Sequence, residues 1–302
     1  MMLLAAIALP ALLWDRPPET AKTLKAAGIV EIAVAADKVA TWKAAGFSAR
    51  ALAPATCMAV PAPQVNMRAN VARATSSPWV DSNSWRFVRN PSAKFCIDAP
   101  GKSAALAAAE AFAYGVDAYI KTDDAGVAAL GAIEGLLHGA WSPEAEAPVA
   151  DIGVNDDGSP ATGEMLNLLS RRNLLYKVVK SPDSSLKLNV TPDRNSPDPS
   201  KQAYAVRQSL GDENRSLRLY GSEVVIARLT RRGNLLRVHL VNYSQRPVNG
   251  LRVRVSGTFP KVDLRSSGAD QPKLLDIVQS DGGTEFTLST MNEYAIVDLA
   301  PR

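Results

Sequence analysis

The spacing of apolar residues changes near residue 215, and this change constrains the fold more than any other feature of the chain. Before it, Ala-rich segments of helical spacing alternate with short apolar runs, which is typical of parallel strands covered by helices. After it, apolar residues occupy every second position in closely spaced runs. Such runs predict strands with one face in a core and one in water, as in an antiparallel β-sandwich. The sequence therefore predicts a multidomain α/β plus all-β protein.

Length and composition agree with two or more folded domains. The chain has 302 residues, of which 46% are hydrophobic and 21% charged, as in globular proteins. Its 34 basic and 30 acidic residues give a net charge of only +4. Basic residues cluster only in short doublets, at Arg171-Arg172 and at Arg231-Arg232. A nucleic-acid binder usually carries a broader basic stripe, so we expect no nucleic-acid partner.

The N-terminus is apolar from Met2 to Trp14. This run is too short to span a bilayer as a helix and has the length of a signal-peptide core. However, no Lys or Arg precedes it, and its Ala-x-Ala site at residues 6–8 lies inside it. A truncated start, or a buried first strand or helix, is the alternative. We interpret residues 1–18 as a candidate signal peptide and expect a secreted or periplasmic protein without a stable membrane span.

The remaining chain divides into three expected parts. Residues 19–147 read as an α/β region with a parallel sheet. In it we expect helices over 19–27, 38–45 and 103–114, strands over 29–35, 49–52, 94–98 and 117–121, and a long surface connection over 54–77. Residues 148–214 read as a flavodoxin-like unit of strand, helix, strand and helix. Residues 215–302 read as the β-sandwich.

The cysteines and histidines do not have the spacing of a zinc site. The spacing leaves the pairing of Cys57 and Cys96 open, and we expect buried thiols rather than a disulfide. His239 falls within an expected strand and has no acidic partner nearby in sequence, so we expect it to be structural, while His138 falls on an expected surface helix. We expect no metal and no cofactor.

The C-terminal strands carry a recognisable pattern. Residues 238–243 read hydrophobic-x-hydrophobic-hydrophobic-Asn-Tyr, further strands follow at 253–255 and 286–288, and residues 294–299 close the pattern from Tyr294 onward. This pattern resembles the β-sandwich at the C-terminus of many multidomain glycoside hydrolases. Residues 150–190 are similar to the class I glutamine-amidotransferase-like domain that lies between barrel and sandwich in some of those enzymes. The catalytic Cys of that family is missing from the segment, so its chemistry is not expected here. The resemblance also implies that residues 19–147 form a shortened or degenerate barrel.

The resemblance implies a protein that hydrolyses or binds a polysaccharide or oligosaccharide. Glycoside hydrolysis needs two carboxyl groups on opposite sides of the sugar. We take Asp81 and Asp98 as the candidate catalytic pair, because Asp81 lies in the aromatic-rich segment 78–87 and Asp98 ends an expected strand. Three other acidic residues have similar positions: Asp123, Asp156 and Asp157. For the latter two, an Asx-type turn is the simpler interpretation.

The segment 78–87 supplies the candidate sugar-binding residues. Trp79 and Trp85 could form an apolar platform for a sugar ring, and Asn83 and Arg86 could bind its hydroxyl groups. The alternative is that both tryptophans belong to a core or domain interface and that Asp98 caps a strand end. At the level of function, the alternative is a non-catalytic scaffold, because about 130 residues are few for a barrel that usually takes roughly 250.

Overall fold

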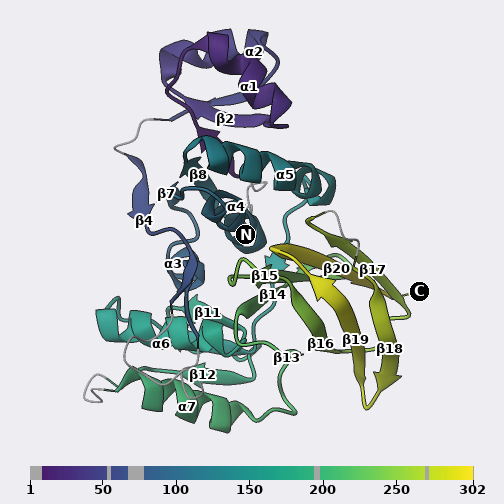
Figure 1. Ribbon diagram of the computed structural model, residues 1–302. Helices are drawn as coiled ribbons and strands as arrows, with labels where there is room; N and C mark the ends of the chain where they lie inside the picture. Colours follow the sequence, from purple (N-terminus) through teal and green to yellow (C-terminus); the bar gives the residue numbers. More distant parts are fainter. Residues whose placement is uncertain (1–8, 53–55, 67–77, 194–197, 269–271, 302) are drawn as a thin grey trace.

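The computed structural model describes residues 9–52, 56–66, 78–193, 198–268 and 272–301. It consists of a parallel sheet with helices, a small second α/β unit, and an antiparallel sandwich that ends the chain (Figure 1). The predicted combination of an α/β region with a β-rich C-terminal part is therefore confirmed. Residues 1–8 of the expected signal segment lie outside the described residues. So do residues 67–77 of the expected surface connection.

Six parallel strands form the N-terminal sheet. The sheet curves into a ring, and around this ring the strands follow one another in the order of the chain. They are β1 (Ala11–Leu13), β2 (Glu31–Val34), β3 (Ser48–Ala51), β4 (Met58–Val60), β7 (Lys94–Asp98) and β8 (Asp117–Lys121). The sheet order is β3-β2-β1-β8-β7-β4, so the last strand, β8, pairs with the first, β1. Pairing of the last strand with the first is how (β/α) barrels close. This sheet has that order with six strands, and it is open between β3 and β4.

The two faces of this sheet bury different residues. On the outer face, side chains such as Leu12, Ile32 and Ile97 join the main core with the helices. On the inner face, Ala11, Ala33 and Tyr119 form a separate small cluster. Side chains of a barrel alternate in the same way between its interior and its helical layer. The segment predicted as a long connection contains β4 and also β5 (Gln64–Asn66), which pairs with β6 (Trp79–Asp81), because strands of three residues leave no readable period in a sequence.

Helices cover the outer face of the ring (Figure 1). They are η1 (Pro18–Thr20), α1 (Ala21–Ala26), η2 (Ala36–Lys38), α2 (Val39–Ala44), α3 (Ser84–Arg89), α4 (Ser103–Tyr114) and α5 (Asp124–Ala140). Helix α4 is central, since residues 104–113 are all buried and it contacts α5, β8 and the sandwich. Its run of alanines permits this close approach on several sides.

Helix α5 approaches the end of α1 at a glycine, and this contact gives a stability prediction. A Cβ atom added to Gly131 would lie 1.7 Å from the carbonyl oxygen of Ala27, a backbone atom that cannot turn away. We expect Gly131→Ala to lower the free energy of unfolding by about 2 kcal/mol, measured by urea denaturation. Gly135→Ala in the same helix, where an added Cβ meets nothing within 4 Å, should instead raise it by about 0.5 kcal/mol. Equal effects of the two changes would contradict the close contact.

The second unit is a three-stranded parallel sheet of order β11-β10-β12 with two helices. Its elements are β10 (Ile152–Asn155), α6 (Pro160–Arg171), β11 (Tyr176–Val179), β12 (Leu188–Val190) and α7 (Pro199–Leu210). The side chain of Ser159 caps α6 by accepting a hydrogen bond from the amide of Thr162, and Pro160 opens the helix. Helix α3 of the first unit packs against α6.

The sandwich consists of two antiparallel sheets that enclose a core of their own. One sheet has the order β13-β16-β19-β18 and the other β17-β20-β15-β14-β9. The strands are β9 (Ala147–Pro148), β13 (Leu217–Tyr220), β14 (Val225–Arg232), β15 (Leu235–Asn242), β16 (Val248–Ser256), β17 (Lys261–Ser266), β18 (Leu274–Ser280), β19 (Gly283–Met291) and β20 (Tyr294–Ala300).

The five-stranded sheet departs from the predicted pattern of one wet face. Its second face packs against α4, so Val241, Tyr294 and Ile296 join the core of the first unit. Arg237 and His239, which the alternation placed toward water, are only 3% and 2% exposed. The expectation of a solvent-facing side is thus wrong for β15 and β20, because a neighbouring unit covers it.

Candidate functional site

A cavity of about 700 Å³ opens at the carboxyl ends of the parallel strands. All six strands of the ring, or the loops that follow them, contribute to its wall. Charged and polar groups come from Asp15, Arg16, Lys38, Asp98, Lys121 and Thr122, and apolar surface from Leu13, Trp14, Ala35, Leu52, Ala59, Val60, Ile97, Tyr119 and the two cysteines. Loops at this edge are free to converge over a barrel, and barrel enzymes hold their active sites there. The volume is within the range of small-molecule sites.

The charged groups of the cavity are arranged around an apolar floor. The side chain of Asp98 is 73% exposed, and its Oδ2 lies 3.9 Å from Nζ of Lys121. Arg16 lies over the ring of Trp14, with its guanidinium carbon 4.8 Å from the ring centroid. The same guanidinium donates a hydrogen bond of 2.7 Å to Asp124. Carboxylates and amines at the mouth above aromatic and aliphatic side chains suit a ligand with an apolar face and many hydroxyl groups.

A disulfide between Cys57 and Cys96 forms part of this wall. It joins the start of β4 to its neighbour β7, with a Cα–Cα distance of 5.5 Å and a sequence separation of 39 residues. The expectation of two thiols is therefore wrong, because the Pro-rich and Ala-rich segment around Cys57 shows no strand pattern that would place it beside Cys96. Closing a loop of this length stabilises the folded state by about 4 kcal/mol in the chain-entropy description.

The two predicted catalytic carboxylates lie in different places. Asp98 is the last residue of β7 and lines the cavity. Asp81 is the last residue of β6 and pairs with Gln64 in the small hairpin outside the ring, away from the residues of the cavity wall. The structure instead brings Asp15, which follows β1, to the same cavity as Asp98. The catalytic role of Asp98 and Asp81 stays a prediction.

The two predicted platform tryptophans face the second unit rather than the cavity. Both are half-buried and pack against the core formed by α6 and its sheet. The guanidinium of Arg171 lies 3.6 Å from the centroid of the Trp79 ring. A Cβ atom added to Gly163 would lie 2.8 Å from the ring of Trp85, so α6 approaches that ring closely. Both tryptophans therefore lie where the alternative interpretation expects them, at an interface between two units.

The side chains of Asn83 and Arg86 make their contacts within the protein. The Asn83 side chain is 1% exposed and donates a hydrogen bond of 2.8 Å to the carbonyl of Pro61. Its Oδ1 accepts a hydrogen bond of 3.1 Å from Arg86. The guanidinium of Arg86 also lies over the ring of Trp85, at 4.4 Å from its centroid. The segment 79–86 therefore holds α3 in place between the first two units.

The other acidic candidates have structural partners. Asp123 accepts hydrogen bonds from the amides of Gly101 and Gly126, at 2.9 and 2.7 Å, which lower its pKa. Asp156 receives two hydrogen bonds from Arg89, at 2.6 and 2.8 Å. It also accepts from the amide of Gly158, as an Asx turn does. Asp157 accepts from the amide of Ser159 and the hydroxyl of Thr162.

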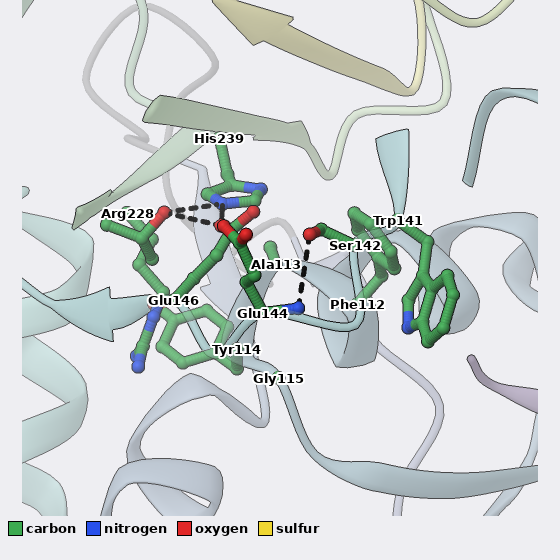
Figure 2. A pocket seen from close by; sticks show the side chains of 11 residues that line it. Phe112, Ala113, Tyr114, Gly115, Trp141, Ser142, Glu144, Glu146, Arg228 and His239 are labelled. Carbon is green, nitrogen blue, oxygen red and sulfur yellow. Dashed lines mark hydrogen bonds and ion pairs between the residues drawn. The ribbon is translucent and has the colours of Figure 1, made fainter. Parts of the chain in front are cut away.

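A second, much smaller hollow lies where α4, the segment after α5 and the sandwich meet. Figure 2 shows the carboxylate of Glu146 beside the ring of His239 in this hollow. Nε2 of His239 lies 3.5 Å from Glu146 and 3.1 Å from the hydroxyl of Thr230, and Nδ1 lies 2.6 Å from the hydroxyl of Tyr294. The volume is about 30 Å³, room for about one water molecule. It cannot hold a sugar ring.

The charges around this hollow favour an ionised Glu146 that is paired with Arg237. Burial raises the pKa of Glu146, but the hydrogen bond with His239 and the charges of His239 and Arg237 outweigh it, and the pKa falls to about 2. Burial lowers the pKa of His239, and Glu146 opposes that shift. Arg237 donates to Glu146 at 2.6 Å. Glu146 could not be predicted as a partner of His239, because the two residues are distant in the chain and only the docking of the sandwich brings them together.

No family model matches the sequence, and no curated protein matches it either. Among solved structures, α-L-fucosidase isoenzyme 2 from Paenibacillus thiaminolyticus is similar, with a TM-score of 0.54 and 9% identity over 70% of this chain and 61% of that enzyme. A GH42 β-galactosidase from G. stearothermophilus matches with a TM-score of 0.38 and 7% identity, over 96% of this chain and 59% of the other. An exo-carrageenase of GH42 from Bacteroides ovatus matches with a TM-score of 0.33 and 10% identity, over 67% and 39%.

The first of these likenesses defines the fold class. This chain, with a strand order that returns to its first strand and an antiparallel sandwich after it, is similar in fold to this fucosidase. The chain spans 61% of the length of the fucosidase that it resembles. Across the described residues, every helix is too short or too polar to cross a membrane.

Proposed function

We propose that this protein binds a short oligosaccharide in the cavity at the carboxyl ends of its parallel strands. The single observation that carries the proposal is that cavity itself, about 700 Å³ in volume and walled by every strand of the ring. The likeness in fold to a fucosidase supports a saccharide as the ligand. Asp98 and Lys121 would exchange hydrogen bonds with sugar hydroxyls at the mouth, above the apolar floor.

Glycoside hydrolysis is the second candidate function. It is favoured by the presence of two carboxylates, Asp15 and Asp98, on the wall of one cavity. Retaining enzymes place such a pair about 5 Å apart and inverting enzymes roughly 6.5 to 9.5 Å apart. A scaffold without enzymatic activity is favoured instead by the six-stranded ring, since barrel enzymes use eight strands.

Within this proposal, the second unit has a structural role and supports the first unit. We take residues 148–214 as an amidotransferase-like unit that lacks the catalytic Cys of that family. Its helix α6 receives the ring of Trp85 and its loop binds Arg89, so it supports α3 and the segment beside it. Export is also part of the proposal, because disulfides such as Cys57–Cys96 form and persist in oxidising compartments. Strand β1 occupies residues 11–13 of the expected signal segment, so we propose export without removal of β1.

Binding measurements on two matched variants test this site. We expect calorimetric titration of the purified chain, guided by a screen of neutral oligosaccharides, to give saturable binding that Asp98→Asn weakens about tenfold, because a hydrogen bond to a charged group is lost. Asp81→Asn removes the same charge from a strand end outside the cavity and should leave the dissociation constant unchanged. Weakening by Asp81→Asn alone would move the site to the hairpin and overturn the proposal.

Release of reducing ends by the same proteins separates binding from hydrolysis. Turnover that disappears in both Asp98→Asn and Asp15→Asn would favour the hydrolase. Saturable binding without turnover favours a binding protein, and a screen without any saccharide bound favours the scaffold.

A further inference from the structure

A groove of about 430 Å³ lies between α6, α7 and β13, and it is separate from the proposed sugar cavity. Arginines dominate its wall. Two lie at the end of α6, one on α7, one just before β13 and one on β13: Arg171, Arg172, Arg207, Arg215 and Arg218. Two carboxylates, Asp212 and Glu223, also line it. The groove therefore has an excess of positive charge although the whole chain is nearly balanced.

Some of these arginines have their charge neutralised within the protein. Asp212 forms ion pairs with Arg207 at 3.3 Å and with Arg215 at 3.1 Å. Arg215 also donates to the carbonyls of Arg172 and Asn173, at 3.2 and 3.1 Å. Arg215 is thus a structural residue that closes the end of α6 onto the start of the sandwich.

Two other arginines of the groove lack a carboxylate partner among the described residues. Arg172 donates one long hydrogen bond, of 3.4 Å, to the carbonyl of Leu168. The side chain of Arg218 has neither a hydrogen bond nor an ion pair within the described part of the chain, and its Nε is buried. Burial and the nearby charge of Arg207 lower the pKa of Arg172. A guanidinium stays charged in such surroundings, and an uncompensated charge withdrawn from water is costly.

We infer that this groove binds an acidic oligosaccharide through a carboxylate or sulfate group placed between Arg172 and Arg218. Guanidinium groups bind both anions with paired hydrogen bonds. The ring of Tyr220, whose residue is 45% exposed, offers a face on which a sugar ring stacks. Glu223 has no partner in the described structure and would accept a hydrogen bond from a sugar hydroxyl.

The same groove is ill suited to a nucleic acid. A nucleic acid carries one charge per nucleotide, and its binding sites are extended basic surfaces. Here the carboxylates of Asp212 and Glu223 lie within the groove beside the arginines. An oligosaccharide with an occasional acidic group avoids those carboxylates, because its neutral rings can lie next to them.

Calorimetric titration of the full chain tests the inference with five probes: trigalacturonic acid, a sulfated oligosaccharide, maltotriose, inorganic sulfate and a single-stranded oligonucleotide. We expect at least one of the two acidic saccharides to bind tenfold or more tightly than maltotriose and inorganic sulfate, and the one that binds identifies the anion. Arg218→Gln should weaken that binding about tenfold or more. The matched control is Arg231→Gln, which removes an exposed arginine from the other sheet of the sandwich, outside the groove, and should change nothing.

Several results would overturn the inference. These are tighter binding of the oligonucleotide, binding of inorganic sulfate alone, equal binding of acidic and neutral saccharides by the Asp98→Asn variant, or equal weakening by Arg218→Gln and Arg231→Gln. If circular dichroism shows that Arg218→Gln does not fold, Arg172→Gln replaces it with the same expected loss. The Asp98→Asn variant should keep this binding, so failure of the sugar cavity and failure of the arginine groove are distinguishable.

Discussion

Replacing Arg237 by Ala should lower the free energy of unfolding by about 4 kcal/mol, because it breaks a buried charge cluster from its centre. The side chain is 3% exposed. Its Nε and Nη2 donate to Asp298 at 2.6 and 3.0 Å, and its Nη1 donates to Glu146 at 2.6 Å and to the carbonyl of Ala140 at 2.8 Å. Without the guanidinium, two largely buried carboxylates lose the cation that they share. Urea denaturation of the two proteins at pH 7 measures the difference.

Arg252→Ala is the matched control for this change. Arg252 also lies on a strand of the sandwich and also pairs with a carboxylate, that of Glu285, but its side chain is 59% exposed. Exposed ion pairs contribute little, so we expect a loss below about 1 kcal/mol. Similar losses of unfolding free energy in both variants would contradict the view that burial makes the Arg237 cluster strongly stabilising.

The position of Arg237 explains why this cluster matters for the whole molecule. Ala140 ends α5, Glu146 lies in the segment that leads to the second unit, and Asp298 belongs to the last strand of the sandwich. One guanidinium therefore connects three parts of the chain that are distant in sequence. Weakening of this contact should loosen the docking of the sandwich on the barrel-like unit before it disturbs the core inside the sandwich.

Local pattern was enough to predict most single elements. The strands over 94–98 and 117–121 and the helix over 103–114 have the predicted bounds, because each is a continuous apolar or Ala-rich run between clear breaks. Of the sandwich strands, β13, β14, β15, β16, β19 and β20 are predicted by their alternation, whereas β17 and β18 are not. Strands β4 and β5 were missed, because three residues in a Pro-rich and Ala-rich segment show no period, and their partners are set by the sheet.

Contacts between units could not be read from the sequence. The alternation in β15 predicts Arg237 and His239 in water, and only the packing of α4 on that face buries them. For the site, the rule that ligands lie at the carboxyl ends of parallel strands led to Asp98 at the wall of the cavity. Residue type alone suggests Trp79 and Trp85 as a platform for a sugar ring, and residue type does not reveal that α6 lies against them.

Glu110 gives the second prediction, because it is a fully buried carboxyl group at the junction of two units. It lies on α4, and its Oε1 accepts hydrogen bonds from the amide of Asn83 at 2.7 Å and from the hydroxyl of Tyr243 at 2.6 Å. Its Oε2 is buried without a partner among the described residues. Burial raises its pKa from 4.5 to about 7, although these hydrogen bonds lower it in part. The folded protein therefore holds a proton that the unfolded chain releases near pH 4.5.

A raised pKa of this kind stabilises the folded state below the unfolded pKa, and the contribution is lost as the pH rises toward about 7. The difference corresponds to about 3 kcal/mol between pH 4.5 and pH 8. We expect Glu110→Gln, which keeps the shape but cannot ionise, to be less destabilising at pH 8 than at pH 5, measured by urea denaturation at both values. Because burial lowers the pKa of His239, its contribution has the opposite sign, so the comparison must be the difference between variant and wild type at each pH.

Glu213→Gln, at an exposed position, serves as the control and should give the same difference from wild type at both values of pH. Glu146 does not disturb the comparison, because its pKa of about 2 means that its contribution is lost only as the pH falls below about 4.5. A constant difference between Glu110→Gln and wild type from pH 5 to pH 8 would mean that Glu110 is already ionised where it lies. In that case Tyr243 and Asn83 would be holding a buried anion, and the junction between α4 and the sandwich would depend on charge rather than on a shared proton.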